Sequence, residues 1–468
     1  MNQASIPMCA DLLAQTHTVF NQTPALVDYN AYDGDTALKQ AVQREGAAWA
    51  VPQIAAHGAR TGSQEVIEWG YQANEFKPQF YSHDRFGNRV DLVKYHDGYH
   101  QLMALGLESG CHALAWTQPK QGAHVARAAM GLLQSQVDAG HGCPLTMTFA
   151  AVPAIQATAS IAAEWLPKIL AHSYDPRNVP HTEKTAVTIG MGMTEKQGGS
   201  DLRETQTTAV YSHSAEYHGA MAHWYELTGH KWFCSVPQSD GFFTLAKVSG
   251  GVTCFFFPRT LPDGSFNRFF IQRLKDKAGN RSNAGSEVEY SGTMAIRVGE
   301  EGRGLREILS HSHLTRLDFA VGSAGLMRQV LTLALNHTTT RSAFGSSLAR
   351  RPMMANVLAD MAVEVEASTL MALRVAKATD CLDTSPQEKA LARVATPVAK
   401  YFNCSRVVAV ANEALQCHGG NGFVEDHPMA RLYREAPLNS VWEGAANMMC
   451  MDVRRAMLQD PNCRDALL

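Results

Sequence analysis

The chain has 468 residues, of which 45% are hydrophobic and 18% are charged, and its formal net charge is −3. This length is enough for two or three domains with a large buried core, and the composition is ordinary for a soluble protein. A dedicated duplex-binding protein usually concentrates basic residues on one face. The near-neutral balance therefore argues against nucleic-acid binding as the main role.

The ten cysteines are dispersed without a CxxC pair, which is typical of buried thiols in a reducing compartment. Cys417 and His418 are adjacent, but no second ligand pair follows at zinc-like spacing, so we expect no metal site. The N-terminus lacks the basic start and apolar core of a signal peptide. The most apolar region, residues 147–165, is interrupted by Pro153 and predicts a buried helix rather than a membrane span. We expect a cytoplasmic protein.

Apolar residues at helical spacing dominate the chain up to about residue 184. Residues 106–116 and 126–137 are examples, and residues 140–144 form a break. The first thirty or so residues, which include a run beginning at His17, predict an extended arm that packs on its own subunit or on a neighbour. We expect residues 1–184 to form this arm and an α-helical domain.

Short β-rich runs replace the helical pattern between residues 185 and 299. They are separated by turn signals such as Asp263-Gly264. Strands so closely spaced predict a compact antiparallel barrel or sandwich. The runs cover residues 207–211, 224–228, 242–248, 252–257 and 269–274.

The helical period returns after Gly304. Apolar faces around Leu317, Val357 and Val407 predict an antiparallel helical bundle over residues 300–468. The fold class is therefore α+β, with domains in the order α, β, α.

A lone carboxylate, Glu443, stands between Trp442 and Gly444 in an otherwise apolar stretch. Such an acid is poorly solvated as an anion, so its pKa should rise, which suits a base for a weakly acidic C–H proton. The alternative is a structural glutamate near the positive end of a helix. On residue types alone, the structural interpretation is the commoner one.

Four further stretches offer groups for a planar, phosphate-bearing cofactor. Met191–Asp201 supplies hydroxyls and glycines whose backbone N–H groups can approach an anion or a ring edge. Gly229–Val236 places aromatic faces beside a serine hydroxyl, and Arg341–Gly345 combines an arginine with an aromatic ring. Leu415–Asp426 has glycines that permit close contact with a pyrophosphate. Taken singly, each stretch is also explained by a turn, strand core, a surface arginine or a helix end.

The order and spacing of these stretches resemble the acyl-CoA dehydrogenase family of flavoproteins. The sequence is similar in particular to the alkylation-response (AidB-type) branch of this family, in the motifs MGMTEKQGGSD, GHKWFCSVPQSD, RLKDKAGNRSNA, RLYRE and NSVWEG. The resemblance covers about residues 17–455. It implies an N-terminal α-helical domain, a middle antiparallel β-barrel and a C-terminal four-helix bundle.

The resemblance also implies a non-covalent FAD between the β domain and the C-terminal bundle. The matching cofactor positions are Met191, Met193, Thr194, Gly199, Ser200, Phe233, Ser235, Arg341, Phe344, Gln416, Gly420, Trp442 and Asn447. In the family, the four positions from Arg341 to Gly420 reach the FAD of a neighbouring subunit. A homo-oligomer, most often a tetramer, is therefore implied.

Glu443 falls at the base position of the family, where a carboxylate removes the proton alpha to a thioester carbonyl while the beta hydride passes to the flavin. Arg316 matches an arginine that holds the geometry around this base. Thr194, Ser200 and Arg455 are the expected substrate contacts. The chain departs from many relatives at Ala445, where threonine is usual, and its bulky Trp442 narrows the acyl channel.

The expected function is that of an FAD-dependent acyl-CoA dehydrogenase-like oxidoreductase acting on an acyl-CoA-like small molecule. The alternative is an alkylation-stress flavoprotein that protects DNA or detoxifies alkylating agents with little dehydrogenase turnover. A nitroalkane-oxidising relative is a third option, but that branch uses aspartate as its base. The AidB-type branch continues into a DNA-binding C-terminal extension, and this chain ends at Leu468. DNA binding is therefore doubtful, and no membrane partner is expected.

Overall fold

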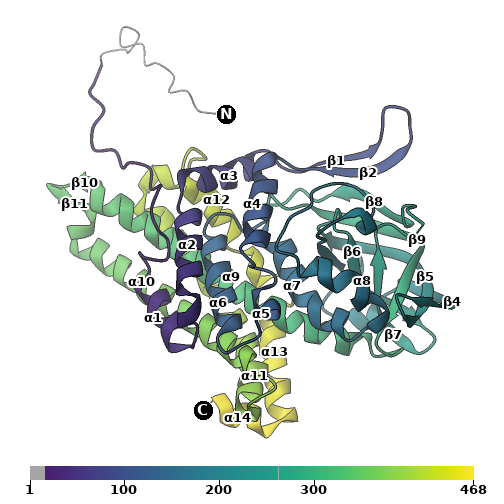
Figure 1. Ribbon diagram of the computed structural model, residues 1–468. Helices are drawn as coiled ribbons and strands as arrows, with labels where there is room; N and C mark the ends of the chain where they lie inside the picture. The colour runs from purple at the N-terminus through teal and green to yellow at the C-terminus, as the bar shows by residue number, and fades with distance from the viewer. Residues whose placement is uncertain (1–15, 262, 468) are drawn as a thin grey trace.

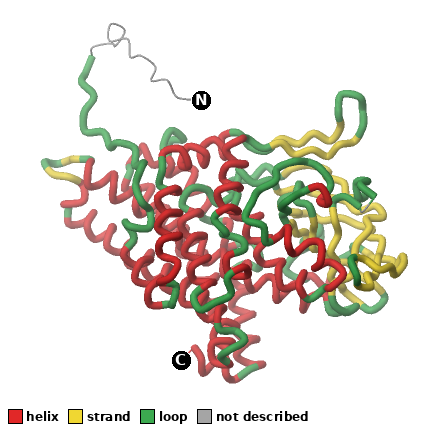
Figure 2. The backbone as a smooth tube through the Cα atoms, viewed as in Figure 1, coloured by secondary structure: helices red, strands yellow, loops and turns green. Residues whose placement is uncertain are grey.

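A computed structural model describes residues 16–261 and 263–467. Nearly all strands gather at one end of the molecule, a short strand pair lies at the opposite end, and helices fill the remainder (Figure 2). Helices from the beginning and the end of the chain lie side by side, whereas the middle of the chain forms the strand-rich end (Figure 1). The predicted order α, β, α is confirmed.

The N-terminal helices pack against the C-terminal bundle. They are α1 (Thr36–Arg44), α2 (Val51–Thr61), α3 (Gln64–Glu75), α4 (Asp97–Glu108), α5 (Leu114–Thr117), α6 (Ala123–Ser135), α7 (Gly142–Gln156) and α8 (Ala159–Ile169). The described part of the arm, from residue 17, is extended. Arg341 donates from Nη1 to the Asn21 carbonyl at 2.6 Å, and Thr23 contacts His337 at 3.1 Å. This part of the arm packs on its own chain; residues 1–15 lie outside the described residues.

Three local expectations for this domain differ from the structure. Residues 106–116 are not one helix, because the chain turns at Gly110, where φ is +81°, between α4 and α5. Residues 147–165 are divided between α7 and α8, with Thr158 before the second helix. An unpredicted hairpin, β1 (Gln79–His83) and β2 (Arg89–Lys94), extends beside the barrel (Figure 1).

Seven strands form the middle domain. They are β3 (Ile189–Gly192), β4 (Thr208–Tyr217), β5 (Ala220–Ser235), β6 (Gly241–Val248), β7 (Gly251–Pro258), β8 (Phe269–Leu274) and β9 (Gly285–Val298). Pairing runs β3-β5-β4-β6-β7-β9-β8, and an additional β5–β9 pairing closes the sheet. Most pairs are antiparallel, as expected, but β3 pairs with β6 in parallel.

Successive side chains along β6 and β7 point alternately to the two faces of the barrel wall. Phe242, Phe255 and Phe257 are buried in one cluster, and Phe243 and Phe256 belong to another. Phe256 meets Trp165 of α8 at a ring-centroid distance of 4.8 Å. The second face therefore anchors the barrel to the helical domain.

Three long helices dominate the C-terminal domain: α9 (Gly304–Thr340), α10 (Pro352–Asp380) and α11 (Pro386–Cys417). Pro352 and Pro386 occupy first-turn positions, where a missing N–H costs little. The remaining elements are β10 (Ser342–Ala343), β11 (Ser346–Ser347), α12 (Pro428–Glu435), α13 (Ala446–Gln459) and α14 (Pro461–Leu467), with the short 3-10 turns η6 (Gly419–Gly422) and η7 (Leu438–Ser440). Among the described helices, none combines the length and apolar character needed to cross a membrane.

Candidate active site

Glu443 lies in a tight turn between η7 and α13. Its φ is +54° and that of Gly444 is +99°, a left-handed conformation that a side-chain-bearing residue adopts only at a cost. A Cβ added to Gly444 would lie 2.6 Å from Cε of Met449. Glycine at position 444 therefore lets the turn close tightly against the first turns of α13.

Two buried cations from the bundle hold this turn. Arg316 of α9 donates from Nε to the Glu443 carbonyl at 3.1 Å. Lys400 of α11 donates from Nζ to the Trp442 carbonyl at 3.0 Å and also to that of Gly444. Arg316 in turn pairs with Asp452 of α13 at 2.8 Å. The backbone of the turn is thus fixed from two helices, which leaves the Glu443 side chain free for chemistry.

The environment of the Glu443 carboxyl raises its pKa. Burial is the largest cause. The charges of Arg316 and Lys400 and the hydroxyls of Ser312 and Thr315 act in the opposite direction, but the net shift is upward. The sequence-based expectation of a raised pKa at position 443 is therefore met for the physical reason given there, which is poor solvation of the anion.

Residues of the N-terminal helical domain and of the barrel lie on the other side of the site from the bundle. Cys143, at the start of α7, is buried, and burial raises the pKa of its thiol to about 12. Lys277 and hydrogen bonding with Ser235 lower this pKa, and the charge of Glu443 raises it. Both Ser235 at the end of β5 and the charge of Glu443 therefore influence the Cys143 thiol. Three segments distant in sequence converge here.

A cavity of about 90 Å³ opens beside Trp442. The Trp442 ring stacks on Phe319 at a centroid distance of 4.7 Å and donates from Nε1 to Asn439 at 3.0 Å. The lining is partly polar: Arg127 makes two hydrogen bonds of 2.6 Å to Asp318. This volume is enough for a few water molecules or a short acyl group.

Glu435 is an unusual carboxyl in the lining of this cavity, to which Glu443 itself does not belong. Burial, reinforced by the neighbouring Asp138, raises the pKa of Glu435 to about 7. Both its oxygens accept from the backbone N–H of Asn280, at 2.8 and 2.7 Å. The cavity therefore carries a carboxyl group that exchanges its proton near neutral pH.

The predicted residues of the first cofactor stretch lie along one edge of the barrel. Pairing of β3 with β5 sets Met191 directly opposite Ser235. Beyond β3, the Thr194 carbonyl accepts from the Trp232 N–H at 2.7 Å, and a Cβ on Gly199 would lie 2.4 Å from the Thr194 hydroxyl. The structure thus brings these residues together on the side where Cys143 approaches Ser235. Met193 is partly buried, and Ser200 is exposed.

Phe233 leaves an aromatic face open on the same edge. Its side chain is 51% exposed, although large aromatic residues are usually buried. The Lys275 ammonium lies 4.8 Å from the ring centroid. An exposed ring beside a serine hydroxyl is the wall that a planar cofactor requires.

The second group of predicted cofactor residues lies far from Glu443. Arg341 caps the C-terminal end of α9, and Phe344 follows in the β10–β11 hairpin with 88% of its side chain exposed. Gln416 lies in the last turn of α11 and Gly420 in η6 directly after it, near the place where the rings of His337 and His418 meet at a centroid distance of 4.7 Å. At 1.5 Å per residue, Arg341 stands about 38 Å along α9 from Arg316. The hairpin and the barrel lie at opposite ends of the molecule (Figure 1).

Two predicted binding residues on α13 lie outside the cavity beside Trp442. Asn447 is exposed in the first turn of this helix, and Arg455 is exposed further along it. Neither residue lines the cavity beside Trp442. Their roles in binding remain predictions.

Sequence reasoning missed Lys400 and Cys143. Lys400 is 1% exposed on the buried face of α11, between the buried residues Thr396 and Asn403. A lysine among buried positions at helical spacing is a signal that could have been followed. Cys143 carried no local signal, because only the tertiary contact with Ser235 and Glu443 distinguishes it from other buried cysteines. The buried pair Glu195–Lys231, at 2.7 Å, was likewise missed.

All three domains of the chain resemble domains of known proteins. Residues 21–176 match the N-terminal domain of the adaptive response protein AidB, residues 190–293 match the acyl-CoA dehydrogenase middle domain, and residues 302–458 match the acyl-CoA dehydrogenase C-terminal domain. AidB of Escherichia coli (strain K12), which is named only provisionally as an acyl-CoA dehydrogenase, is 43% identical over 97% of this chain and 82% of that protein. The chain belongs to the acyl-CoA dehydrogenase family.

Solved structures of two relatives share the whole fold. The acyl-CoA dehydrogenase-type protein ACDH-11 of Caenorhabditis elegans, in complex with C11-CoA, has a TM-score of 0.87 at 27% identity over 96% of this chain and 78% of that one. The apo-form of Bd2924 also has a TM-score of 0.87, at 29% identity over 96% of this chain and 89% of that one. The chain is an FAD-dependent, acyl-CoA dehydrogenase-like oxidoreductase of the AidB type.

The residues present fit FAD, the cofactor of the acyl-CoA dehydrogenase family. The half-exposed Phe233 ring lies on the strand that carries Ser235. A Cβ at Gly198 or Gly420 would meet no atom within 4 Å, so the backbone at both places is open to a close approach. These aromatic faces and open glycines form two groups at opposite ends of the fold, and their contact with FAD stays a prediction.

Proposed function

We propose that Glu443 is the base that removes the alpha proton of an acyl thioester. The observation that supports this most strongly is the environment of its carboxyl group. Its pKa is raised by burial, its backbone is held by Arg316 and Lys400, and it faces Cys143 and the end of β5. A base with a raised pKa has a greater affinity for the proton that it must abstract.

The backbone N–H of Glu443 is proposed to polarise the thioester carbonyl. Among the described residues, this N–H has no hydrogen-bond partner, and the left-handed turn holds it in a fixed orientation. A fixed donor stabilises the negative charge that develops on the carbonyl oxygen as the alpha proton leaves. Arg316 is a positioning residue, because it acts through the Glu443 carbonyl. When bound, FAD supplies the acceptor for the hydride that leaves the beta carbon.

Each cofactor site is proposed to be shared between two subunits of a homotetramer. Met191, Met193, Thr194, Gly199, Ser200, Phe233, Ser235, Trp442 and Asn447 would hold FAD from the chain that supplies Glu443. The group of Arg341, Phe344, Gln416 and Gly420 would hold the FAD of a neighbouring chain, since about 38 Å of α9 separates it from Arg316. We further propose a cytoplasmic location and domain divisions after residues 184 and 299.

Short thioesters are proposed as the preferred substrates. The cavity beside Trp442 measures about 90 Å³ and is lined by Arg127, Asp318 and Glu435 among others. The C. elegans relative binds C11-CoA, which supports an acyl-CoA ligand for this chain as well. The small volume of this cavity nevertheless favours a short acyl group. Thr194, Ser200 and Arg455 are proposed to contact the thioester outside the cavity.

The decisive experiment compares flavin bleaching by acyl-CoA thioesters in the wild-type protein and in Glu443→Gln. The purified protein should be yellow, and a short thioester such as butyryl-CoA should bleach the flavin absorbance. Glu443→Gln should retain FAD and lose bleaching by at least about 10²-fold. Glu413→Gln, an exposed position on α11, is the matched control. Full bleaching by Glu443→Gln would remove this residue from the mechanism.

A role in alkylation stress is the second candidate. It is supported by the match of residues 21–176 to a domain named for the adaptive response. The formal net charge of −3 is unfavourable for duplex binding. We therefore propose that any protective role acts on small alkylating agents rather than through DNA. Salt-dependent retention of the protein on duplex DNA would contradict this proposal.

A further inference from the structure

A second cavity, of about 280 Å³, lies where the helical domain meets the barrel. It is lined by Tyr95, Tyr99, His100, Tyr174, Arg177, Lys184, Val236 and Arg259 among others, and we call it the tyrosine pocket. Pro144 and Val236 belong to its lining, whereas their chain neighbours Cys143 and Ser235 face the Glu443 site. The tyrosine pocket is therefore separate from the proposed active site, although only one layer of residues divides them.

Aromatic rings form one wall of the tyrosine pocket. Tyr95 and Tyr99 stack at a centroid distance of 4.1 Å with an interplanar angle of 20°. The Tyr174 hydroxyl meets Nδ1 of His100 at 2.8 Å. This wall presents flat, largely apolar surfaces to the cavity, and such surfaces bind planar or apolar groups.

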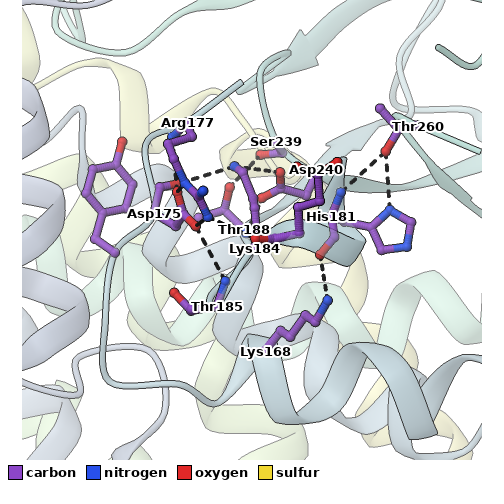
Figure 3. Close-up of polar contacts among 12 residues, drawn as sticks. Lys168, Asp175, Arg177, His181, Lys184, Thr185, Thr188, Ser239, Asp240 and Thr260 are labelled. Carbon is purple, nitrogen blue, oxygen red and sulfur yellow. Dashed lines mark hydrogen bonds and ion pairs between the residues drawn. The ribbon is translucent and has the colours of Figure 1, made fainter. Parts of the chain in front are cut away.

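Charged residues form the other wall, and the carboxylates of Asp175 in this wall and of Asp240 beside it are already engaged (Figure 3). Lys184 pairs with Asp240 at 2.8 Å. Arg177 makes two hydrogen bonds to Asp175, of 2.8 and 2.7 Å. Both carboxylates therefore have cationic partners within the wall itself.

Arg259 supplies an additional positive charge that has no such partner. Among the described residues, its guanidinium group makes no hydrogen bond or ion pair, and its Nε is fully buried. Burial lowers its pKa, and only the more distant charge of Asp240 opposes this effect. Its backbone is fixed by hydrogen bonds with Asp240, at 2.8 Å, and Asn267, at 2.9 Å. A guanidinium held at a cavity without an anion is costly to the fold unless a ligand satisfies it.

Tyr99 supplies a second unsatisfied donor. The residue is 2% exposed, and its hydroxyl has no hydrogen-bond partner among the described residues. Burial raises the pKa of Tyr99 well above its usual range, so the hydroxyl stays protonated and able to donate. Buried polar groups are nearly always hydrogen-bonded in native proteins. Tyr99 and Arg259 both belong to the lining of the cavity, and an acceptor-bearing ligand is the kind of group that satisfies such donors.

We propose that the tyrosine pocket binds a small organic oxyanion, a carboxylate or a phosphate monoester on a planar body, with its anionic group paired to Arg259. The planar guanidinium fork matches the geometry of either anionic group. The body of the ligand packs on the ring wall of Tyr95, Tyr99 and Tyr174. This function is independent of Glu443 and goes beyond the proposed dehydrogenase chemistry.

The test is calorimetric titration of the FAD-loaded protein with four probes. Benzoate and phenyl phosphate carry the two anionic groups on the same ring, benzamide is the neutral analogue, and inorganic phosphate lacks the ring. At least one aromatic anion should bind about tenfold or more tightly than benzamide. Whichever anion binds better identifies the natural class, and binding should survive Glu443→Gln.

Variants connect this binding to the two unsatisfied donors. Arg259→Gln should weaken the binding of the preferred anion by about tenfold or more, and Tyr99→Phe by a few-fold. Arg259→Lys keeps the charge, should retain part of the affinity and serves if Arg259→Gln fails to fold. Arg203→Gln, an exposed position, is the matched control. Equal binding of benzamide, unchanged affinity in both Arg259 variants, or no binding of either aromatic anion would overturn the proposal.

Discussion

At the scale of single residues, the raised pKa of Glu443, the proposed base, predicts how the rate of the reaction depends on pH. The base must be ionised to accept the alpha proton, and burial raises its pKa above 4.5. The rate of flavin bleaching should therefore increase with pH through an acidic limb that lies above 4.5. A stopped-flow pH profile checks this expectation. A limb at or below the ordinary glutamate value would show that the titrating group is not this buried carboxyl.

Lys400 allows a second test of how neighbouring charges set the pKa of Glu443. Its charge lowers the pKa of Glu443, and its ammonium donates to the carbonyls of Trp442 and Gly444. Lys400→Met should move the acidic limb to higher pH and reduce bleaching between about tenfold and hundredfold, because the turn loses an anchor. Lys389→Met, an exposed position on the same helix, should change neither quantity. A slower reaction with an unmoved limb would assign Lys400 a purely structural role.

At the scale of elements, the buried pair of Glu195 and Lys231 links the loop after β3 to β5. Each residue is 1% exposed, and Glu195 also accepts from the Thr207 hydroxyl at 2.6 Å. Glu195→Gln would leave the Lys231 ammonium buried without a counter-charge, so the free energy of unfolding should fall by about 3–5 kcal/mol. Urea denaturation measures this loss. The double variant Glu195→Gln with Lys231→Met should recover much of it, and Glu204→Gln, which is exposed, should be neutral.

The sequence predicted most elements where local pattern carries the information. Strands β6, β7 and β8 were located to within a residue or two, because their apolar character is strong and turns bound them. Strands β4 and β5 are longer than predicted. The missed half of β4 is mostly polar and exposed, whereas the missed ends of β5 include buried residues such as Lys231 and Cys234. The hairpin of β1 and β2 was missed because it has little burial of its own. The resemblance, rather than periodicity, selected a barrel over a sandwich.

Less of the candidate site than of the fold could be predicted from local sequence patterns. The raised pKa of Glu443 followed from its neighbours in the sequence, whereas its anchors lie far away along the chain: Arg316 is 127 residues from it. The resemblance supplied Arg316, but Lys400 and Cys143 required the folded structure. The tyrosine pocket gave no sequence signal, because its residues come from five separated segments. Tertiary contacts of this kind have no local periodicity to reveal them.

At the scale of the whole molecule, the two groups of cofactor residues predict complementation between defective subunits. Glu443→Gln should abolish bleaching, and Arg341→Gln with Phe344→Ala should abolish FAD retention. In a mixed dimer of these two variants, one site carries both defects and the other carries none. Co-expressed and co-purified subunits should therefore regain about a quarter of wild-type bleaching under random association. No recovery above the two parent variants would show that each chain holds its cofactor alone.

In the proposed oligomer, the uninterrupted helix α9 fixes the distance between neighbouring reaction centres. Arg316 lies within the first half of this helix, Arg341 caps its C-terminal end, and the 37 continuous helical residues include no loop that could absorb a change of length. Inserting a single residue near its middle would rotate the far end by about 100° and displace it by about 1.5 Å. One insertion would thus misalign two centres in two subunits, whereas a longer loop at the barrel surface would disturb neither.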